Sequence, residues 1–251
     1  MNIYRRIYLL ALIIMAAGAA RSSELRILTT EVPPLAFVKD GKVGGFCVDL
    51  VQDIQRRLGN ASTIEVFPWA RAYLMAQTEP NTLLVCPKRT PEREKLFQWI
   101  GPLLISDTNF YAKKGSHLTL RTLAEARKLP NILVLRESYS YTYLNANGFQ
   151  NLYLVNSPSG MMKMLIADRA PVMVMERIQA DAVIRDEHIP PQDVHAVLTL
   201  QSLSSNLAFS PDVPAATVKQ WKTAFEAMKQ DGSYARVHRK WFSAPRAAES
   251  P

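Results

Sequence analysis

The feature that most constrains the fold is a regular alternation of strand-like and helix-like segments. A first unit has strand-like runs and amphipathic helical segments in the order 25–30, 48–58, 62–67, 70–77 and 82–86. A helix between two strands carries the chain back across the sheet, so strands that alternate with helices pair in parallel. The first unit therefore predicts a parallel sheet covered by helices.

A second unit of the same kind lies further along the chain. Strand-like runs alternate with helical segments at 132–135, 140–147, 152–155, 159–167, 172–175 and 178–186. Strand-like runs at 196–200 and 206–209 follow, before an amphipathic helix at 215–230 and a short last helix that reaches Phe242. No long flexible linker separates the two units. We expect an α/β fold of two lobes joined by short crossings, with the final helices on the first lobe.

Composition supports a globular chain and excludes several classes of function. Of the 251 residues, 48% are hydrophobic and 21% are charged, which is enough apolar material to bury a core. The formal net charge of +8 is scattered, and no Gly-rich phosphate loop, zinc spacing or aromatic-basic RNA motif occurs. We therefore expect no nucleic-acid partner, no metal and no cofactor. The methionines clustered at 161–164 and 173–175 are expected to pack in the core.

The first residues have the pattern of a secretory signal. Arg5 and Arg6 precede an apolar run at 7–17, which ends in the small residues of a cleavage site. The run is shorter than the roughly 20 apolar residues that span a bilayer, which argues against the alternative of a membrane anchor. We expect residues 1–20 to be a cleaved signal peptide and the mature protein to be periplasmic.

Cys47 and Cys86 leave two readings open. In an oxidising compartment they could form one disulfide, and they could equally be two small buried thiols. The spacing does not decide between the two.

Five short strings, in order over nearly the whole mature chain, resemble one known family. They lie at 34–37, 45–50, 90–93, 101–103 and 221–234. With these strings the chain resembles the periplasmic solute-binding proteins of bacterial amino-acid uptake systems, known as solute-binding family 3. The resemblance implies a two-lobed periplasmic binding protein type II fold, each lobe a mainly parallel sheet flanked by helices. It places lobe 1 at 24–106 and 204–245, and lobe 2 at 107–203.

The resemblance implies a receptor and not an enzyme. Such a protein captures a small carboxylate-containing solute, an amino acid or a derivative, by hinge closure. We expect a monomer that delivers this solute to an ABC permease at the inner membrane. Two alternatives stay open: an enzyme similar to periplasmic cyclohexadienyl dehydratases, and a sensory or accessory protein that docks non-covalently on a membrane protein.

Residues of lobe 1 provide the first part of the expected site. Helix N-termini and the carboxyl ends of parallel strands should face the cleft, where backbone N–H groups favour an anion. Arg93 matches the carboxylate-binding arginine of the family, and a guanidinium presents paired donors to a carboxylate; the alternative is a surface ion pair with Glu92 or Glu94. Trp69 matches an aromatic residue that packs on the ligand, or it is a core tryptophan. Arg71 could assist, although a solvated helix position is the simpler reading.

Lobe 2 would close the site from the other side. Ser138 and Tyr139 correspond to the small hydroxyl residues that hold a carboxylate in the family, although a plain helix N-cap role for Ser138 is equally consistent. Glu137 departs from the family, which commonly has glycine there, and would tend to repel an anion.

The sequence departs from the family at two further positions. One is the acid that receives an amino group, and the other is a residue that usually makes a polar contact. Pro171 stands where the resemblance places that acid, and a proline side chain cannot receive an ammonium. Glu176 or Glu31 could replace it, although each is more often a surface or capping acid. Cys86 matches a family serine, which weakens the usual polar contacts. Binding of an ordinary α-amino acid is therefore in doubt.

Overall fold

The computed structural model describes residues 25–136 and 138–242, and one mixed sheet runs through the whole molecule. Its strand order is β4-β1-β5-β10-β6-β9-β7-β8. The strands are β1 (Arg26–Thr29), β4 (Ile64–Val66), β5 (Thr82–Lys88), β6 (Gln98–Lys113), β7 (Ile132–Leu135), β8 (Leu152–Val155), β9 (Val172–Glu176) and β10 (Val194–Phe209). A separate hairpin pairs β2 (Phe37–Lys39) with β3 (Lys42–Gly44).

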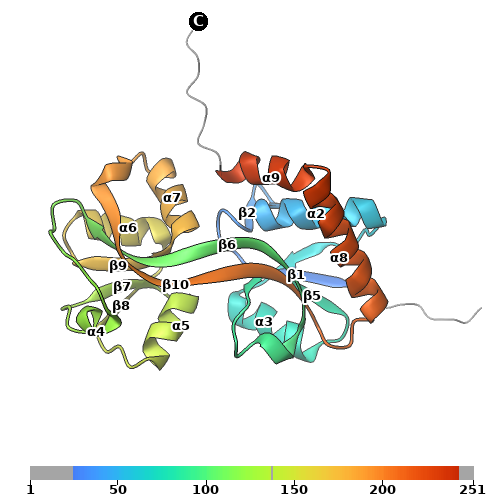
Figure 1. Cartoon of the computed structure of the whole chain (residues 1–251), viewed down its shortest axis with the longest axis horizontal. Helices are drawn as coiled ribbons and strands as arrows, with labels where there is room; N and C mark the ends of the chain where they lie inside the picture. Colours follow the sequence, from blue (N-terminus) through green and yellow to red (C-terminus); the bar gives the residue numbers. More distant parts are fainter. Residues whose placement is uncertain (1–24, 137, 243–251) are drawn as a thin grey trace, which may run out of the picture.

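The helices gather at the two ends of this sheet and define two lobes (Figure 1). Lobe 1 contains β1 to β5 with α2 (Phe46–Leu58), α3 (Trp69–Thr78), α8 (Ala215–Gln230) and α9 (Ser233–Phe242). Lobe 2 contains β7 to β9 with α4 (Leu123–Ala126), α5 (Tyr139–Ala146), α6 (Pro158–Ile166) and α7 (Arg177–Asp186). Short 3₁₀ turns lie at Glu94–Leu96 and Pro191–Asp193.

Within each lobe the strands of the alternating units are parallel, as the sequence predicts. β1 pairs in parallel with β4 and β5, and β7 pairs in parallel with β8 and β9. The helices between them make the return crossings. Gly59 ends α2 in the left-handed conformation, with φ of 64°, which suits a glycine at a helix C-terminus.

The connection between the lobes differs from the prediction of two sheets joined by short crossings. β6 and β10 are each 16 residues long and form an antiparallel pair that extends from one lobe to the other (Figure 1). The runs predicted at 196–200 and 206–209 belong to one strand, and 98–113 was not predicted as a strand. Gly101 and Pro102 interrupt the β pattern of that segment, and its two halves bury side chains in different lobes.

Separate clusters of buried side chains support the two lobes. In lobe 1, Phe46 of α2 packs with Trp221 and Phe225 of α8, and none of the three is more than 2% exposed. In lobe 2, the buried methionines of α6 and β9 confirm the predicted core role of that cluster; they are Met161, Met162, Met173 and Met175. Ile178 of α7 is buried within the lobe 1 cluster, so the two lobes are in contact in this structure.

A glycine in β6 fits a close approach between the two crossing strands. Gly101 has φ of 151°, and an added Cβ would lie 2.3 Å from Oδ1 of Asn206. Asn206 is 1% exposed, and its amide donates to the Ser204 carbonyl and hydroxyl oxygens at 3.0 and 2.8 Å. The pairing of β6 and β10 shifts register at this point, between Ser205 and Leu207.

We expect Gly101→Ala to lower the free energy of unfolding by at least about 2 kcal/mol, because it adds backbone strain and displaces a bonded amide. Urea unfolding measures the change. Gly115→Ala is the matched control: its φ is also positive, at 79°, but nothing lies within 4 Å of the added Cβ, so it should cost about 1 kcal/mol. Equal losses in the two variants would contradict the argument.

Candidate ligand-binding site

A pocket of about 160 Å³ lies between the two lobes. It is lined by residues of lobe 1, which include Thr30, Val32, Leu35, Trp69, Cys86, Lys88 and Arg93, and by residues of lobe 2, which include Leu135, Arg136, Ser138, Tyr139, Met175, Glu176 and Gln179. Lys88, Leu135 and Glu176 are the last residues of β5, β7 and β9. The pocket therefore lies at the carboxyl ends of parallel strands, where the topology favours ligand binding.

Arg93 of lobe 1 reaches this pocket from the turn that follows β5. Its backbone N–H donates to the carbonyl of buried Thr90 at 3.0 Å, and its Nη1 donates to the carbonyl of Lys88 at 3.2 Å. The alternative was a surface ion pair with Glu92 or Glu94. Glu94 pairs with Arg89 at 2.5 Å instead. Exposed Glu92 makes no ion pair with Arg93 among the described residues, although its charge acts on the Arg93 guanidinium. Burial lowers the pKa of Arg93 from its ordinary value, while nearby Tyr73 and Tyr139 act in the opposite direction.

Three aromatic rings surround the Arg93 guanidinium, and we call them the aromatic cage. The guanidinium carbon of Arg93 lies 4.9 Å from the ring centroids of both Trp69 and Tyr73, and 5.7 Å from that of Tyr139. Trp69 and Tyr73 stack on each other at 5.2 Å. Such faces attract a cation and fix its position. Because Tyr139 belongs to lobe 2, the cage is completed across the cleft.

Ser138 and Tyr139 lie where lobe 2 meets the pocket. The Ser138 hydroxyl oxygen caps α5 by accepting from the Tyr141 N–H at 3.1 Å, so the N-cap reading is correct, and the residue also lines the pocket. The Tyr139 hydroxyl donates to Oε1 of Gln201 at 3.5 Å, and burial raises the pKa of Tyr139. Glu137 lies outside the residues that the structure describes.

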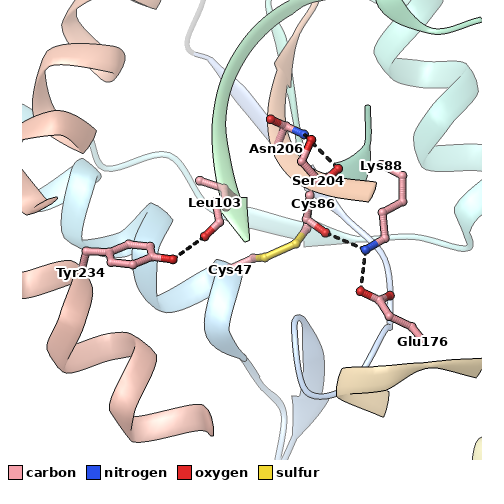
Figure 2. The surroundings of a disulfide bond; sticks show 9 residues. Cys47, Cys86, Lys88, Leu103, Glu176, Ser204, Asn206 and Tyr234 are labelled. Atoms are coloured by element: carbon pink, nitrogen blue, oxygen red, sulfur yellow. Dashed lines mark hydrogen bonds and ion pairs between the residues drawn. A yellow bond between two sulfur atoms is a disulfide. The ribbon is translucent and has the colours of Figure 1, made fainter. Parts of the chain in front are cut away.

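An ion pair crosses the pocket from one lobe to the other. Nζ of Lys88 lies 2.5 Å from Oε1 of Glu176, and the two side chains are 15% and 11% exposed. Nζ also donates to the Ser205 hydroxyl at 3.1 Å. Figure 2 shows Lys88 pointing from lobe 1 toward Glu176. Lys88 was not among the site residues predicted from the sequence; its place at the end of β5, shortly before the string at 90–93, was the available signal.

Two of the residues considered from sequence lie outside the pocket. Glu31 is exposed and accepts from the backbone N–H of Val38 at 3.1 Å. Arg71 is exposed, with its guanidinium carbon 4.6 Å from the Phe67 ring centroid. Neither is among the residues that line the pocket, whereas Arg93, Trp69, Ser138, Tyr139, Glu176 and Cys86 are brought together there.

The two cysteines form a disulfide beside the pocket, which decides between the two readings of the sequence. Cys47 in the first turn of α2 is bonded to Cys86 of β5, with Cα atoms 6.1 Å apart (Figure 2). Cys86 lines the pocket but has no free thiol to offer a ligand. The bond instead ties the end of β5, from which Lys88 projects, to the helix behind it.

Neither a metal-binding cluster nor a membrane-spanning helix occurs among the described residues. Across residues 25–136 and 138–242, no group of three or more His, Cys, Asp or Glu side chains is placed to hold a metal ion. In the same part of the chain, no helix has both the length and the apolar character needed to cross a membrane.

Comparison with known proteins gives one consistent family. A family model described as "Bacterial extracellular solute-binding proteins, family 3" matches residues 25–244. A relative from Chlamydia trachomatis serovar D, named "Probable ABC transporter arginine-binding protein ArtJ", is 25% identical over 238 residues, which cover 89% of this chain and 88% of the relative. The resemblance noted in the sequence is thereby confirmed.

Solved structures show the same fold. A histidine kinase sensor domain with similarity to periplasmic binding proteins has a TM-score of 0.75 at 17% identity, over 89% of this chain and 98% of that one. An ABC uptake transporter substrate binding protein from Streptococcus pneumoniae, with bound histidine, has a TM-score of 0.74 at 18% identity, over 89% and 94% of the two chains. At these identities the likeness shows the fold alone, and the predicted two-lobed periplasmic binding protein fold is correct.

Proposed function

Because this chain belongs to family 3 of the bacterial extracellular solute-binding proteins, we propose that it captures a small carboxylate-containing solute for an ABC transporter. The single observation that supports binding of a carboxylate is the position of Arg93, whose guanidinium lines the pocket between the lobes. Among residues 25–136 and 138–242, no carboxylate forms an ion pair with it. A half-buried guanidinium that no described carboxylate pairs with can receive an anion.

The proposed capture uses hinge closure between a lobe 1 of 24–106 with 204–245 and a lobe 2 of 107–203. The β6–β10 register supports these boundaries, since Leu203 pairs with Ser106 and Ser204 pairs with Ile105. With these boundaries, β6 and β10 pass from one lobe to the other at residues that are paired in the sheet. The contact of Tyr139 with Arg93, and of Ile178 with the lobe 1 core, fits a closed arrangement.

The proposed partner is an ABC permease at the inner membrane. We propose that the protein acts as a monomer in the periplasm, after removal of residues 1–20. The name of the Chlamydia trachomatis relative, which refers to an ABC transporter, supports this assignment. The signal segment lies outside the residues that the structure describes. We also propose that the protein is not an enzyme: a dehydratase would need a general acid over a bound ring, and Glu176 is held by Lys88.

Titration calorimetry against a panel of small carboxylic acids tests this function. We expect at least one acid to bind with micromolar affinity, about 8 kcal/mol, because a receptor for uptake needs no more. Small-angle scattering should show the protein most compact with that acid bound, since ligand contacts that exist only in the closed state stabilise it. Incubation with prephenate should give no change in absorbance. Absence of binding by every acid, or prephenate turnover, would contradict the proposal.

A further inference from the structure

The acidic group of the pocket already has a cationic partner from the protein itself. Among the described residues that line the pocket, Glu176 is the one with a carboxylate. A free carboxylate in such a pocket could receive the ammonium of an α-amino acid. Here the ammonium of Lys88 occupies that place, 2.5 Å from Oε1 of Glu176.

Several contacts hold Lys88 in this position. Its ammonium donates to the Ser205 hydroxyl at 3.1 Å, and Lys88 and Ser205 are paired across β5 and β10. Its carbonyl accepts from Nη1 of Arg93 at 3.2 Å. The side chain is 15% exposed. An incoming ammonium would have to displace a bonded, largely desolvated lysine and then lie beside its positive charge, which is costly in a medium of low dielectric constant.

Apart from the Lys88–Glu176 pair, the charges of the pocket favour a ligand that has an anionic group and no cationic group. Lys88 and Glu176 pair with each other, and among the described residues no carboxylate forms an ion pair with the Arg93 guanidinium that lines the pocket. Arg136 also lines the pocket, but it is exposed and donates to Asn156 Oδ1 at 3.0 Å. Much of the remaining lining is apolar, including Val32, Leu35, Leu135, Met161 and Val174. An apolar lining suits the uncharged body of a small acid.

We infer that Lys88 is a specificity-determining residue, which replaces the ligand's ammonium at Glu176 and makes the protein a receptor for small carboxylates that lack an amino group. This inference rests on the proposed function, because it assumes that a carboxylate binds at Arg93. It adds the class of acid: a carboxylate with an apolar or aromatic body, in preference to the matching α-amino acid.

Calorimetric titration with pairs of compounds that differ only in the α-amino group tests the inference. The pairs are 3-phenylpropanoate with L-phenylalanine, pentanoate with L-norvaline, and 5-guanidinopentanoate with L-arginine. For the wild type we expect the acid without the amino group to bind about 100-fold more tightly in each pair that binds, because an amine would leave buried charges badly paired. Equal or tighter binding of the α-amino acid would overturn the inference and leave the proposed function standing.

The variant Lys88→Met removes the ammonium and leaves Glu176 free. We expect the ratio of the two dissociation constants to shift by about 100-fold or more toward the α-amino acid. Lys222→Met is the matched control, since it removes the same charge from an exposed position on α8; its ratio should equal that of the wild type. An unchanged ratio in Lys88→Met would overturn the inference.

A second variant covers the case in which Lys88→Met does not fold. Glu176→Gln removes the carboxylate that an ammonium would need, so the preference for the acid without the amino group should persist or increase. A switch of Glu176→Gln toward the α-amino acid would overturn the inference. If neither a compound of any pair nor any acid of the larger panel binds the wild type, the proposed function fails together with the inference. That result differs from binding of the α-amino acids alone, which overturns only the inference.

Discussion

Replacement of Arg93 by alanine is expected to raise the dissociation constant for a bound carboxylate by about 100- to 1000-fold. Truncating one member of a hydrogen-bonded, desolvated charge pair typically costs roughly 2–5 kcal/mol. The environment of Arg93 in the aromatic cage fits this range, since the guanidinium is partly buried and held between rings. Calorimetric titration with the tightest-binding acid of the panel measures the change.

The control for this variant lies in the same lobe. Arg71→Ala removes an arginine that is exposed and does not line the pocket, so it should change the dissociation constant by less than about twofold, as expected for a distant surface charge. Arg93→Lys keeps the charge but loses the planar fork, and it should fall between the two. If Arg93→Ala bound the acid as tightly as the wild type, the carboxylate site would have to be placed elsewhere.

Removal of the disulfide is expected to lower the free energy of unfolding by about 4 kcal/mol. Cys47 and Cys86 are 39 residues apart, and the chain-entropy relation gives a value of this size for a loop of about 40 residues. Cys47→Ala combined with Cys86→Ser is the variant of choice, because Cys47 is fully buried whereas Cys86 borders the pocket. Urea unfolding of the oxidised wild type and of the variant measures the difference.

Reduction provides the control for the disulfide. A reducing agent should destabilise the wild type by a similar amount and leave the double variant unchanged. A loss below about 1 kcal/mol would show that the bond constrains the unfolded chain far less than the loop-entropy relation requires.

The parts of the fold that the sequence predicted are those with local signals. Both alternating units, the final amphipathic helix and its place on lobe 1 follow from periodicity and stop signals such as Gly59. β6 was missed because a strand that serves two lobes shows no single pattern of burial, and because Gly101 interrupts it. The joining of two predicted sheets into one depended on this strand.

The candidate site was likewise predicted only in part from the sequence. Arg93, Trp69 and Tyr139 were predicted because they match site positions of the family that the chain resembles. Each also lies near a strand end or a helix start, and such positions meet at one edge of a parallel sheet. Lys88 could not be paired with Glu176, because the two are 88 residues apart and meet only when the lobes are in contact. Glu31 was a candidate by charge alone, and its backbone partner Val38 holds it outside the pocket.

The chain order of lobe 1 has a consequence for folding during synthesis. Its core needs Phe46 from the N-terminal part together with Trp221 and Phe225 from α8, and β5 pairs with β10 on one side. A chain that emerges from the ribosome N-terminus first therefore cannot complete this core until its last segment has been synthesised. The strands and helices of lobe 2 are contiguous in sequence, so they can acquire their structure while the earlier part is still waiting for its C-terminal partner.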